Sequence, residues 1–303
     1  MGQLLERLPH HSRIAVIRLR SLGDCVLTTP ALSLLKAYRP NIEIAIVVED
    51  RFRGVFEGNT DIAQILPPKL SAIRRWHPDL TLNLHGGTRS MWLAAASGAR
   101  NFAGFAHHAY SFLYNARIPR AQETLGVERA VHTAEHLASA MFWLGVPQTE
   151  IPRAKLVASK TGVNSPYVIL HPFASAPEKT WPAERFVAVA RQLQQSGLDP
   201  VFVAGPTDNV QPFSNFRVYR NAPLSEIKAL IAPAHLFIGN DSGPAHIAAA
   251  FGVPAVVLFG PSNPVTWAPW RTEARVLTSA EGMAGISTDE VNAAADSLRK
   301  VKA

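Results

Sequence analysis

Short apolar runs alternate with amphipathic segments along the first half of the chain. The apolar runs are hydrophobic at nearly every position, which is typical of strands buried on both faces of a parallel sheet. The pattern predicts strands over residues 14–19, 42–48, 61–66 and 80–84. It predicts helices over residues 25–38, 52–57, 70–75, 89–97 and 132–144, with an irregular segment rich in His, Tyr and Arg over 106–130.

The second half of the chain repeats this alternation. It predicts strands over residues 167–170, 200–204, 217–219, 235–238 and 255–259. Helices are expected over residues 181–197, 224–232 and 288–301, the last with Ser287 or Thr288 as its N-cap.

The repeated alternation predicts two Rossmann-like, doubly wound α/β domains that face a central cleft. We expect an N-terminal domain over residues 1–150 and a C-terminal domain over 165–303, joined by a proline-containing linker of about 151–164. Such sheets bind ligands outside the carboxyl ends of their strands. Asp24, Gly86, His171 and Asp241 all fall at predicted carboxyl ends, so these residues are candidates for a site.

Residues 237–262, FIGNDSGPAHIAAAFGVPAVVLFGPS, carry the strongest signal for a binding site. An apolar strand ends in the polar cluster Asn240, Asp241, Ser242 and Gly243, and a helix follows at once with His246 one turn in. This arrangement directs free backbone N–H groups and the positive end of a helix dipole at one spot. It predicts a site for an anionic ligand such as a phosphate, although His246 taken alone also fits a half-buried core histidine.

Composition and charge narrow the function classes. The chain has 303 residues and a formal net charge of +7, which favours acidic partners such as a phosphorylated substrate or an anionic membrane face. The positive charge is spread along the chain and not concentrated in one patch, so we expect no nucleic-acid partner. The single cysteine excludes a disulfide framework. Residues 1–11 lack an apolar signal segment, and a cytoplasmic protein is expected.

Several motifs of other enzyme classes are absent from the sequence. Neither predicted first turn carries GxGxxG, which counts against a nicotinamide or flavin cofactor. The chain also has no HExxH, no His/Asp spacing suited to a metal and no GxSxG. We therefore expect no metal site, no cofactor and no serine hydrolase.

Asp24 follows the first strand and has two interpretations. Asp is a preferred N-cap, so it fits the start of the predicted helix. It equally fits a general base at the carboxyl end of the sheet.

The segment HPFASAPEKTWPAERF contains two further candidates, Lys179 and Trp181. Lys179 suits a phosphate but also fits an ordinary solvated lysine, and Trp181 alone fits core packing.

Three segments together resemble glycosyltransferase family 9, the lipopolysaccharide heptosyltransferase family, which has the GT-B fold. They are RLRSLGDCVLTTPAL, KTWPAERF and NDSGPAHIAAAFGVPAVVLFGPSNPVTWAPW, in the family's order. The resemblance implies an inverting, metal-independent transfer of heptose from ADP-heptose to a lipopolysaccharide core or lipid A acceptor. It implies that the C-terminal domain binds the nucleotide sugar and the N-terminal domain the acceptor.

The resemblance also assigns roles to residues. It implies Asp24 as the catalytic base and Lys179 as the cation that faces the donor phosphates. The donor-binding candidates are His171, Lys179, Trp181, Asn240, Asp241, Ser242, Gly243 and His246. For an anionic acceptor we select the arginines beside the early strands, Arg18, Arg20, Arg51 and Arg89, and we expect peripheral contact with the cytoplasmic face of the inner membrane. Another GT-B enzyme that uses a UDP-sugar, a sugar epimerase and a non-catalytic nucleotide-binding protein stay open as alternatives.

Overall fold

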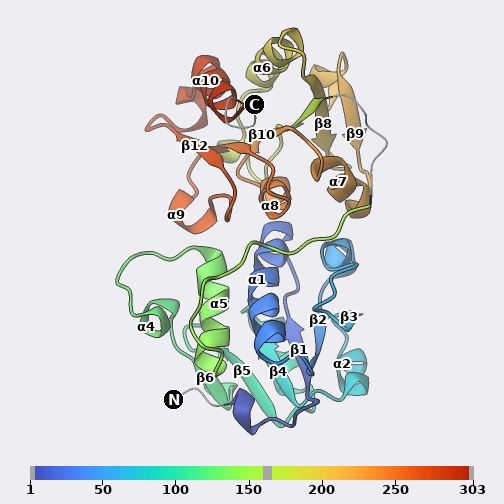
Figure 1. Ribbon diagram of the computed structural model, residues 1–303, viewed down its shortest axis with the longest axis vertical. Helices are drawn as coiled ribbons and strands as arrows, with labels where there is room; N and C mark the ends of the chain where they lie inside the picture. The colour runs from blue at the N-terminus through green and yellow to red at the C-terminus, as the bar shows by residue number, and fades with distance from the viewer. Residues whose placement is uncertain (1–3, 160–165, 300–303) are drawn as a thin grey trace. The chain divides into compact units, whose positions relative to one another are not determined.

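The computed structural model describes residues 4–159 and 166–299. The chain divides into two compact units, an N-terminal unit, Met1–Val157, and a C-terminal unit, Ala158–Ala303. Each unit is built on its own six-stranded parallel sheet with helices on both faces, so the predicted doubly wound α/β architecture is confirmed (Figure 1).

The sheet of the N-terminal unit has the strand order β3-β2-β1-β4-β5-β6. Its strands are β1 (Arg13–Ile17), β2 (Glu43–Val47), β3 (Gln64–Leu66), β4 (Leu80–Asn83), β5 (Asn101–Phe105) and β6 (Ala116–Ile118). Its helices are α1 (Leu22–Tyr38), α2 (Leu70–Trp76), α3 (Thr88–Ala95), α4 (Ala121–Leu125) and α5 (Thr133–Leu144). Two short strands, β3 and β6, form the edges of this sheet.

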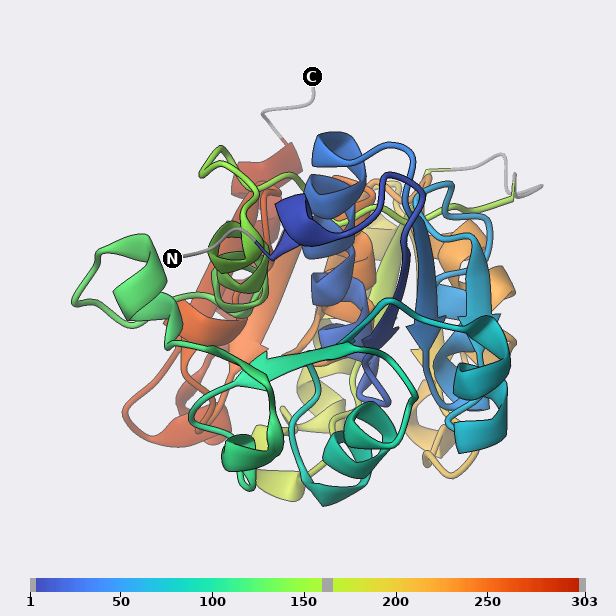
Figure 2. The same ribbon diagram turned by 90° about the horizontal axis from the view of Figure 1, so that it is seen from below.

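Helices cover both faces of this sheet, which explains the uninterrupted apolar strands. Ile14 and Val16 of β1 are fully buried, and so are Ala15 and Ile17 on the opposite face. Ala15 and Ile17 pack in a core cluster with residues of α2 and α3, while α1 and α5 pack against each other on the other face (Figures 1 and 2). A strand with a helix layer on each side has no solvent-facing positions for polar residues.

The sheet of the C-terminal unit has the strand order β12-β11-β10-β7-β8-β9. Its strands are β7 (Tyr167–His171), β8 (Asp199–Ala204), β9 (Arg217–Arg220), β10 (Leu236–Asn240), β11 (Ala255–Phe259) and β12 (Ala274–Thr278). Its helices are α6 (Ala183–Gln195), α7 (Leu224–Ile231), α8 (Gly243–Ala250), α9 (Pro264–Trp267) and α10 (Thr288–Arg299).

Two helices of this unit show why the sequence folds as it does. In α6, Phe186, Val189, Ala190 and Leu193 recur at helical spacing and are buried against the sheet. Full burial of each larger side chain contributes about 1.5–3 kcal/mol. Before α10, Ser287 Oγ accepts from the Glu290 backbone N–H at 3.2 Å while Glu290 accepts from the Ser287 N–H at 2.8 Å. This capping box fixes the start of the helix at Ser287.

The sequence reasoning misses some elements. The segment 106–130, expected to be irregular, contains β6 and α4. The helix expected over 52–57 is a 3-10 helix at Asp50–Val55, and β12 was not anticipated. These elements are short or partly exposed, so their hydrophobic pattern is weak. Residues 151–159 of the expected linker form no helix or strand, and 160–164 lie outside the described residues, as does the end of the helix expected to reach 301.

Candidate active site

The turn between β10 and α8 brings the strongest sequence motif into one compact arrangement. Asn240 ends the strand, and Asp241 and Ser242 form the turn, with Ser242 as the N-cap of α8. Ser242 Oγ donates to the Asn240 carbonyl at 3.0 Å, and the Asp241 N–H donates to the Leu258 carbonyl at 2.9 Å. These bonds fix the backbone of the turn and place it at the positive end of the α8 dipole.

A lysine distant in sequence lies beside this turn. Lys179, at the end of a 3-10 helix (Pro177–Lys179), has its Nζ 3.6 Å from Asp241 Oδ2. The Lys179 side chain is 30% exposed and the Asp241 side chain 11%, so the ammonium group is accessible while the carboxylate is mostly covered. The structure thus brings together the cation and the helix terminus that the sequence suggested for a phosphate, and Asp241 orients the cation.

Close packing of backbone holds the Lys179 segment in place. A Cβ on Gly260, just after β11, would collide with the Glu178 carbonyl, so only glycine fits there. The Trp181 backbone N–H donates to Asn240 Oδ1 at 3.2 Å, which ties the segment directly to the end of β10. Both contacts depend on residues next to Lys179 and not on its side chain.

Two of the donor-site candidates, Trp181 and Asn240, are buried. The Trp181 indole is fully buried, donates to the Ile286 carbonyl at 2.9 Å and packs edge-on against Phe186. Asn240 is also fully buried. Both side chains are buried, and the bond between the Trp181 N–H and Asn240 Oδ1 positions the Lys179 segment. The interpretation of Trp181 as core packing is the correct one.

Two histidines complete the C-terminal candidates. His171 ends β7, and its Nδ1 is 2.9 Å from the Val203 carbonyl, to which it donates. Burial lowers the pKa of His171, so its ring is neutral near pH 7. His246, in α8, is 4% exposed, and its ring centroid is 6.4 Å from that of Trp267 in α9. His246 is thus largely buried beside the motif turn.

Asp24 lies in the first turn of α1, and the helix N-cap is Ser21. The interpretation of Asp24 as the N-cap is therefore wrong. Its carboxylate accepts from Arg18 Nη1 at 3.2 Å and from Ser21 Oγ at 2.9 Å. The Asp24 side chain is 23% exposed, whereas that of Arg18 is 6% exposed. The turn therefore presents an accessible carboxylate that is held by a buried cation and a hydroxyl group.

The four predicted acceptor arginines have different environments. Arg18 is occupied by Asp24 and is buried, so it supports the carboxylate and is poorly placed to contact an acceptor. Arg20, at the end of the β1 segment, is exposed. Arg51 and Arg89 are exposed and share Glu49, at 3.0 and 3.6 Å. The structure thus brings Arg51 and Arg89 together beside the carboxyl end of β2.

The sequence reasoning missed a group of histidines at the same edge of the N-terminal sheet. Phe105, the last residue of β5, stacks on His136 of α5 with ring centroids 4.1 Å apart. The ring centroids of His107 and His108 lie 5.4 and 5.5 Å from that of Phe105. Burial, together with the neighbouring His107, lowers the pKa of His108 and of His136 to about 4. Burial and the Arg18 charge lower the pKa of His85, which follows β4. The signal available was the placement of His85 directly after the strand predicted over 80–84, whereas His107 and His108 follow β5, which was not predicted.

The described residues contain neither a candidate metal site nor a helix that could span a membrane. Within residues 4–159 and 166–299, no group of three or more His, Cys, Asp or Glu side chains is arranged to hold a metal ion. No helix in the same ranges is long and apolar enough to cross a membrane.

Cys25 is buried in α1, and burial raises the pKa of its thiol to about 12, so it is not a nucleophile.

The chain is similar to known proteins over most of its length. Residues 70–293 match the model of glycosyltransferase family 9 (heptosyltransferase). Lipopolysaccharide heptosyltransferase 3 of Escherichia coli K12 is 27% identical over 296 residues, which cover 83% of each chain. A family 9 glycosyltransferase from Veillonella parvula is similar in structure, with a TM-score of 0.85 and 26% identity over 96% of this chain and 97% of that one.

A second solved structure confirms the fold. The E. coli ADP-heptose lipopolysaccharide heptosyltransferase II has a TM-score of 0.83 and 20% identity over 96% of this chain and 99% of its own. Together with the family match, the order of the motifs and the strand-end residues, these similarities identify the enzyme class. The chain belongs to glycosyltransferase family 9, the heptosyltransferase family, and is a glycosyltransferase with the GT-B fold.

Proposed function

We propose that this enzyme transfers heptose from ADP-heptose to a lipopolysaccharide core or lipid A acceptor with inversion at the anomeric carbon and without a metal ion. The observation that carries the proposal is the pairing of Lys179 with Asp241 at the N-terminal end of α8. Two of the relatives named above are lipopolysaccharide heptosyltransferases, and one of these two is named for ADP-heptose.

The C-terminal unit supplies the donor site in this proposal. When the glycosidic bond breaks, negative charge grows on the departing diphosphate oxygen. The Lys179 ammonium and the backbone N–H groups at the start of α8, near Ser242 and Gly243, offset this charge. Asp241 holds Lys179 in place through the 3.6 Å contact, and the buried Trp181 and Asn240 fix the segment that carries it.

The N-terminal unit supplies the acceptor site and the base. Asp24 removes the proton from the acceptor hydroxyl as its oxygen attacks the anomeric carbon. One displacement inverts the configuration, so no covalent intermediate on the enzyme is required. Arg18 and Ser21 orient the carboxylate, and the exposed Arg20, Arg51 and Arg89 are available for the anionic groups of the acceptor. The net charge of +7 favours peripheral attachment to the cytoplasmic face of an anionic inner membrane.

The test combines nucleotide binding with a transfer assay. Calorimetric titrations with ADP, UDP and GDP should give the tightest binding for ADP. Purified enzyme should then convert ADP-heptose and a heptose-free core saccharide to ADP and a product heavier by one heptose, at the same rate with and without EDTA. Consumption of a UDP-sugar in place of ADP-heptose, or loss of activity in EDTA that a divalent metal restores, would overturn the proposal.

A further inference from the structure

The helix that carries Asp24 has a proline in its interior. The helix α1 has Asp24 in its first turn and Pro30 inside it. Proline has no backbone N–H, so Pro30 cannot donate a hydrogen bond to the carbonyl of Val26, four residues earlier. The ladder of backbone hydrogen bonds is therefore interrupted between the turn that presents Asp24 and the rest of α1. Helices bend most readily at interruptions of this kind.

The hydroxyl group of Thr29 fills this gap. Thr29 Oγ1 donates to the Val26 carbonyl at 2.8 Å, which gives that carbonyl the partner that Pro30 cannot supply. The same oxygen accepts from the backbone N–H of Lys155 at 2.9 Å, a residue 126 positions later in the chain. Thr29 and Val26 are fully buried, so neither group has water as an alternative partner. A segment at the end of the N-terminal unit is thus bonded to α1 directly beside its proline.

The side chain of Lys155 connects this point to the next turn of α1. Lys155 Nζ donates to Asp61 Oδ1 at 2.6 Å, and Ser33 Oγ donates to Asp61 Oδ2 at 2.7 Å. Thr29 precedes Pro30 in α1 and Ser33 follows it, so the two bonded groups lie on either side of the interruption. We refer to Thr29, Ser33, Asp61 and Lys155 as the Pro30 bridge.

The Pro30 bridge is partly shielded from water and has further support. The side chains of Asp61 and Lys155 are 12% and 38% exposed, so salt screens their ion pair less than a pair at the surface. Asn59, which is 4% exposed, donates from Nδ2 to the Lys155 carbonyl at 3.1 Å and accepts from the Asp61 N–H at 3.0 Å. One buried amide therefore holds both members of the ion pair, which gives Lys155 a fixed place beside α1.

We propose that Lys155 is a positioning residue for the transfer reaction, because it keeps the two parts of α1 in line across Pro30 and thereby sets the position of Asp24. The inference rests on the proposed role of Asp24 as the base. It adds a residue that lies outside the three segments that resemble the family and that acts through α1. Misplacement of a reacting group by about 1 Å lowers a rate by about a hundredfold, so a small bend at Pro30 is enough to matter.

The first experiment measures the helix without turnover. Lys155→Met removes the ammonium group and Thr29→Val removes the hydroxyl group, and each variant keeps a side chain of similar size. Hydrogen exchange followed by mass spectrometry should show faster exchange of residues 22–30 in both variants than in the wild type, while exchange of the C-terminal unit stays the same. Unchanged exchange of residues 22–30 in both variants would overturn the inference.

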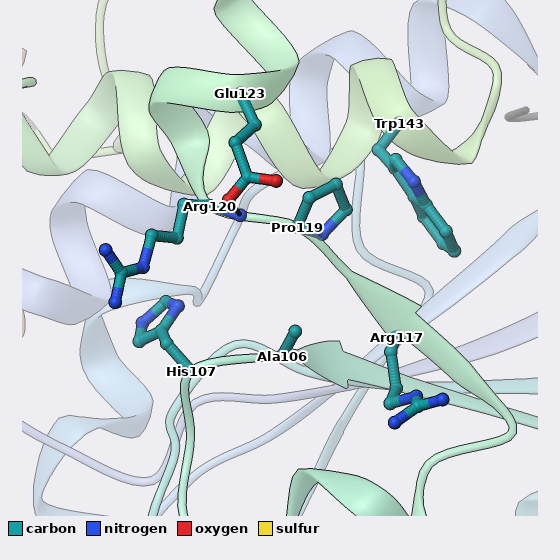
Figure 3. A pocket seen from close by; sticks show the side chains of 7 residues that line it. All are labelled: Ala106, His107, Arg117, Pro119, Arg120, Glu123 and Trp143. Carbon is teal, nitrogen blue, oxygen red and sulfur yellow. Dashed lines mark hydrogen bonds between the residues drawn. The ribbon is translucent and has the colours of Figure 1, made fainter. Parts of the chain in front are cut away.

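Two controls test whether the effect is specific to the Pro30 bridge. Lys36→Met removes the lysine of α1, which follows Pro30 and donates to the Ile42 carbonyl at 2.7 Å. Arg117→Gln removes an exposed cation on β6, where Arg117 lines a pocket formed by residues between Ala106 and Trp143 (Figure 3). Both controls should exchange over residues 22–30 as the wild type does. Faster exchange in both would show a general loss of order in the unit and would also contradict the inference.

The second experiment measures the reaction and includes a rescue. Lys155→Met should lower kcat about tenfold per folded enzyme, with the ADP-heptose KM and the affinity for ADP unchanged. Pro30→Ala restores a backbone donor for Val26, so adding Lys155→Met to Pro30→Ala should change kcat by less than about twofold. Unchanged kcat in Lys155→Met, or the same loss of kcat with and without Pro30→Ala, would refute the positioning role. If the wild type transfers no heptose, the proposed function fails, while hydrogen exchange still decides whether Lys155 holds α1.

Discussion

Each unit places an aspartate in a turn between a central strand and the helix that follows it, after β1 and after β10, but the two aspartates are supported in different ways. Asp24 pairs with Arg18, a residue of its own turn whose side chain is 6% exposed. Asp241 pairs with Lys179, which comes from a separate segment and is 30% exposed. A buried guanidinium orients the carboxylate that it contacts. An accessible ammonium is instead available to a ligand. The comparison therefore supports our proposal that the aspartate itself acts in the turn after β1, whereas in the turn after β10 it supports the cation.

The largest effect is expected for Asp24→Asn. The amide cannot accept the proton of the acceptor hydroxyl, so turnover should fall by about 10²- to 10⁴-fold while ADP affinity is unchanged. The melting temperature should also fall by several degrees, because the buried Arg18 loses its countercharge. The rate is therefore measured per folded enzyme by initial-rate assay. Ser21→Ala, which removes one hydrogen bond to the same carboxylate, is the control and should keep most of the activity. More than about a tenth of wild-type turnover in Asp24→Asn would place the base elsewhere.

Lys179→Ala should have the next largest effect. Loss of the cation that offsets leaving-group charge should lower kcat by about a hundredfold or more. Lys179→Arg should recover only part of this rate, since the planar guanidinium differs in shape from an ammonium. Arg185→Ala, a nearby cation that binds the Ala284 and Ile286 carbonyls, is a control for general loss of charge in this unit. Near-normal kcat in Lys179→Ala would show that the lysine is a surface residue.

Asp241→Ala tests the aspartate of the C-terminal unit, which pairs with Lys179. If Asp241 supports Lys179 at the donor site, its removal should weaken ADP binding at least tenfold, or about 1.4 kcal/mol. Isothermal titration of ADP measures this directly. The matched control is Asp208→Ala, a carboxylate after β8 that accepts from the Gly205 N–H at 2.7 Å. Equal ADP affinity in folded Asp241→Ala and wild type would remove Asp241 from the donor site.

The smallest effect concerns stability in acid. The pKa of His108 and His136 is about 4 in the folded enzyme, below the ordinary value of 6.5. Between pH 6.5 and 4 the unfolded chain binds protons that the folded one does not, so stability falls as the pH decreases through this window. His136→Phe keeps the stacking on Phe105 and should reduce the loss of melting temperature between pH 6.5 and 4.5. His235→Asn, at an exposed position, should leave the profile as in the wild type.

Much of the fold and of the candidate site could be predicted from the sequence. The strands β1 and β10 are continuous apolar runs because helices cover both faces, and that pattern is local. The turn from Asn240 to Gly243 could likewise be predicted, since the strand end, the polar cluster and the helix are contiguous in the sequence. The burial of Trp181 could not be predicted from its neighbours in the sequence, because its indole N–H donates to the carbonyl of Ile286, which is 105 residues away.

The support around Asp24 was harder to predict than its position. Asp24 was one candidate for the N-cap because Asp is a common cap, whereas the structure starts the helix earlier, with Ser21 as the N-cap. His85 and His108 follow the neighbouring strands β4 and β5, and His136 lies in α5, so only the folded unit brings the three segments together. The strand β6 and the helix α4 lie in a segment that was expected to be irregular, because both elements are too short to show a hydrophobic period.

The central claim is that Asp24 acts as a base in a single displacement on a donor held at Lys179 and Asp241. Its most direct test is the anomeric configuration of the heptose that wild-type enzyme transfers to a core saccharide, determined by NMR of the purified product. The account predicts that this configuration is opposite to that in the donor. Retention of the donor configuration would contradict it.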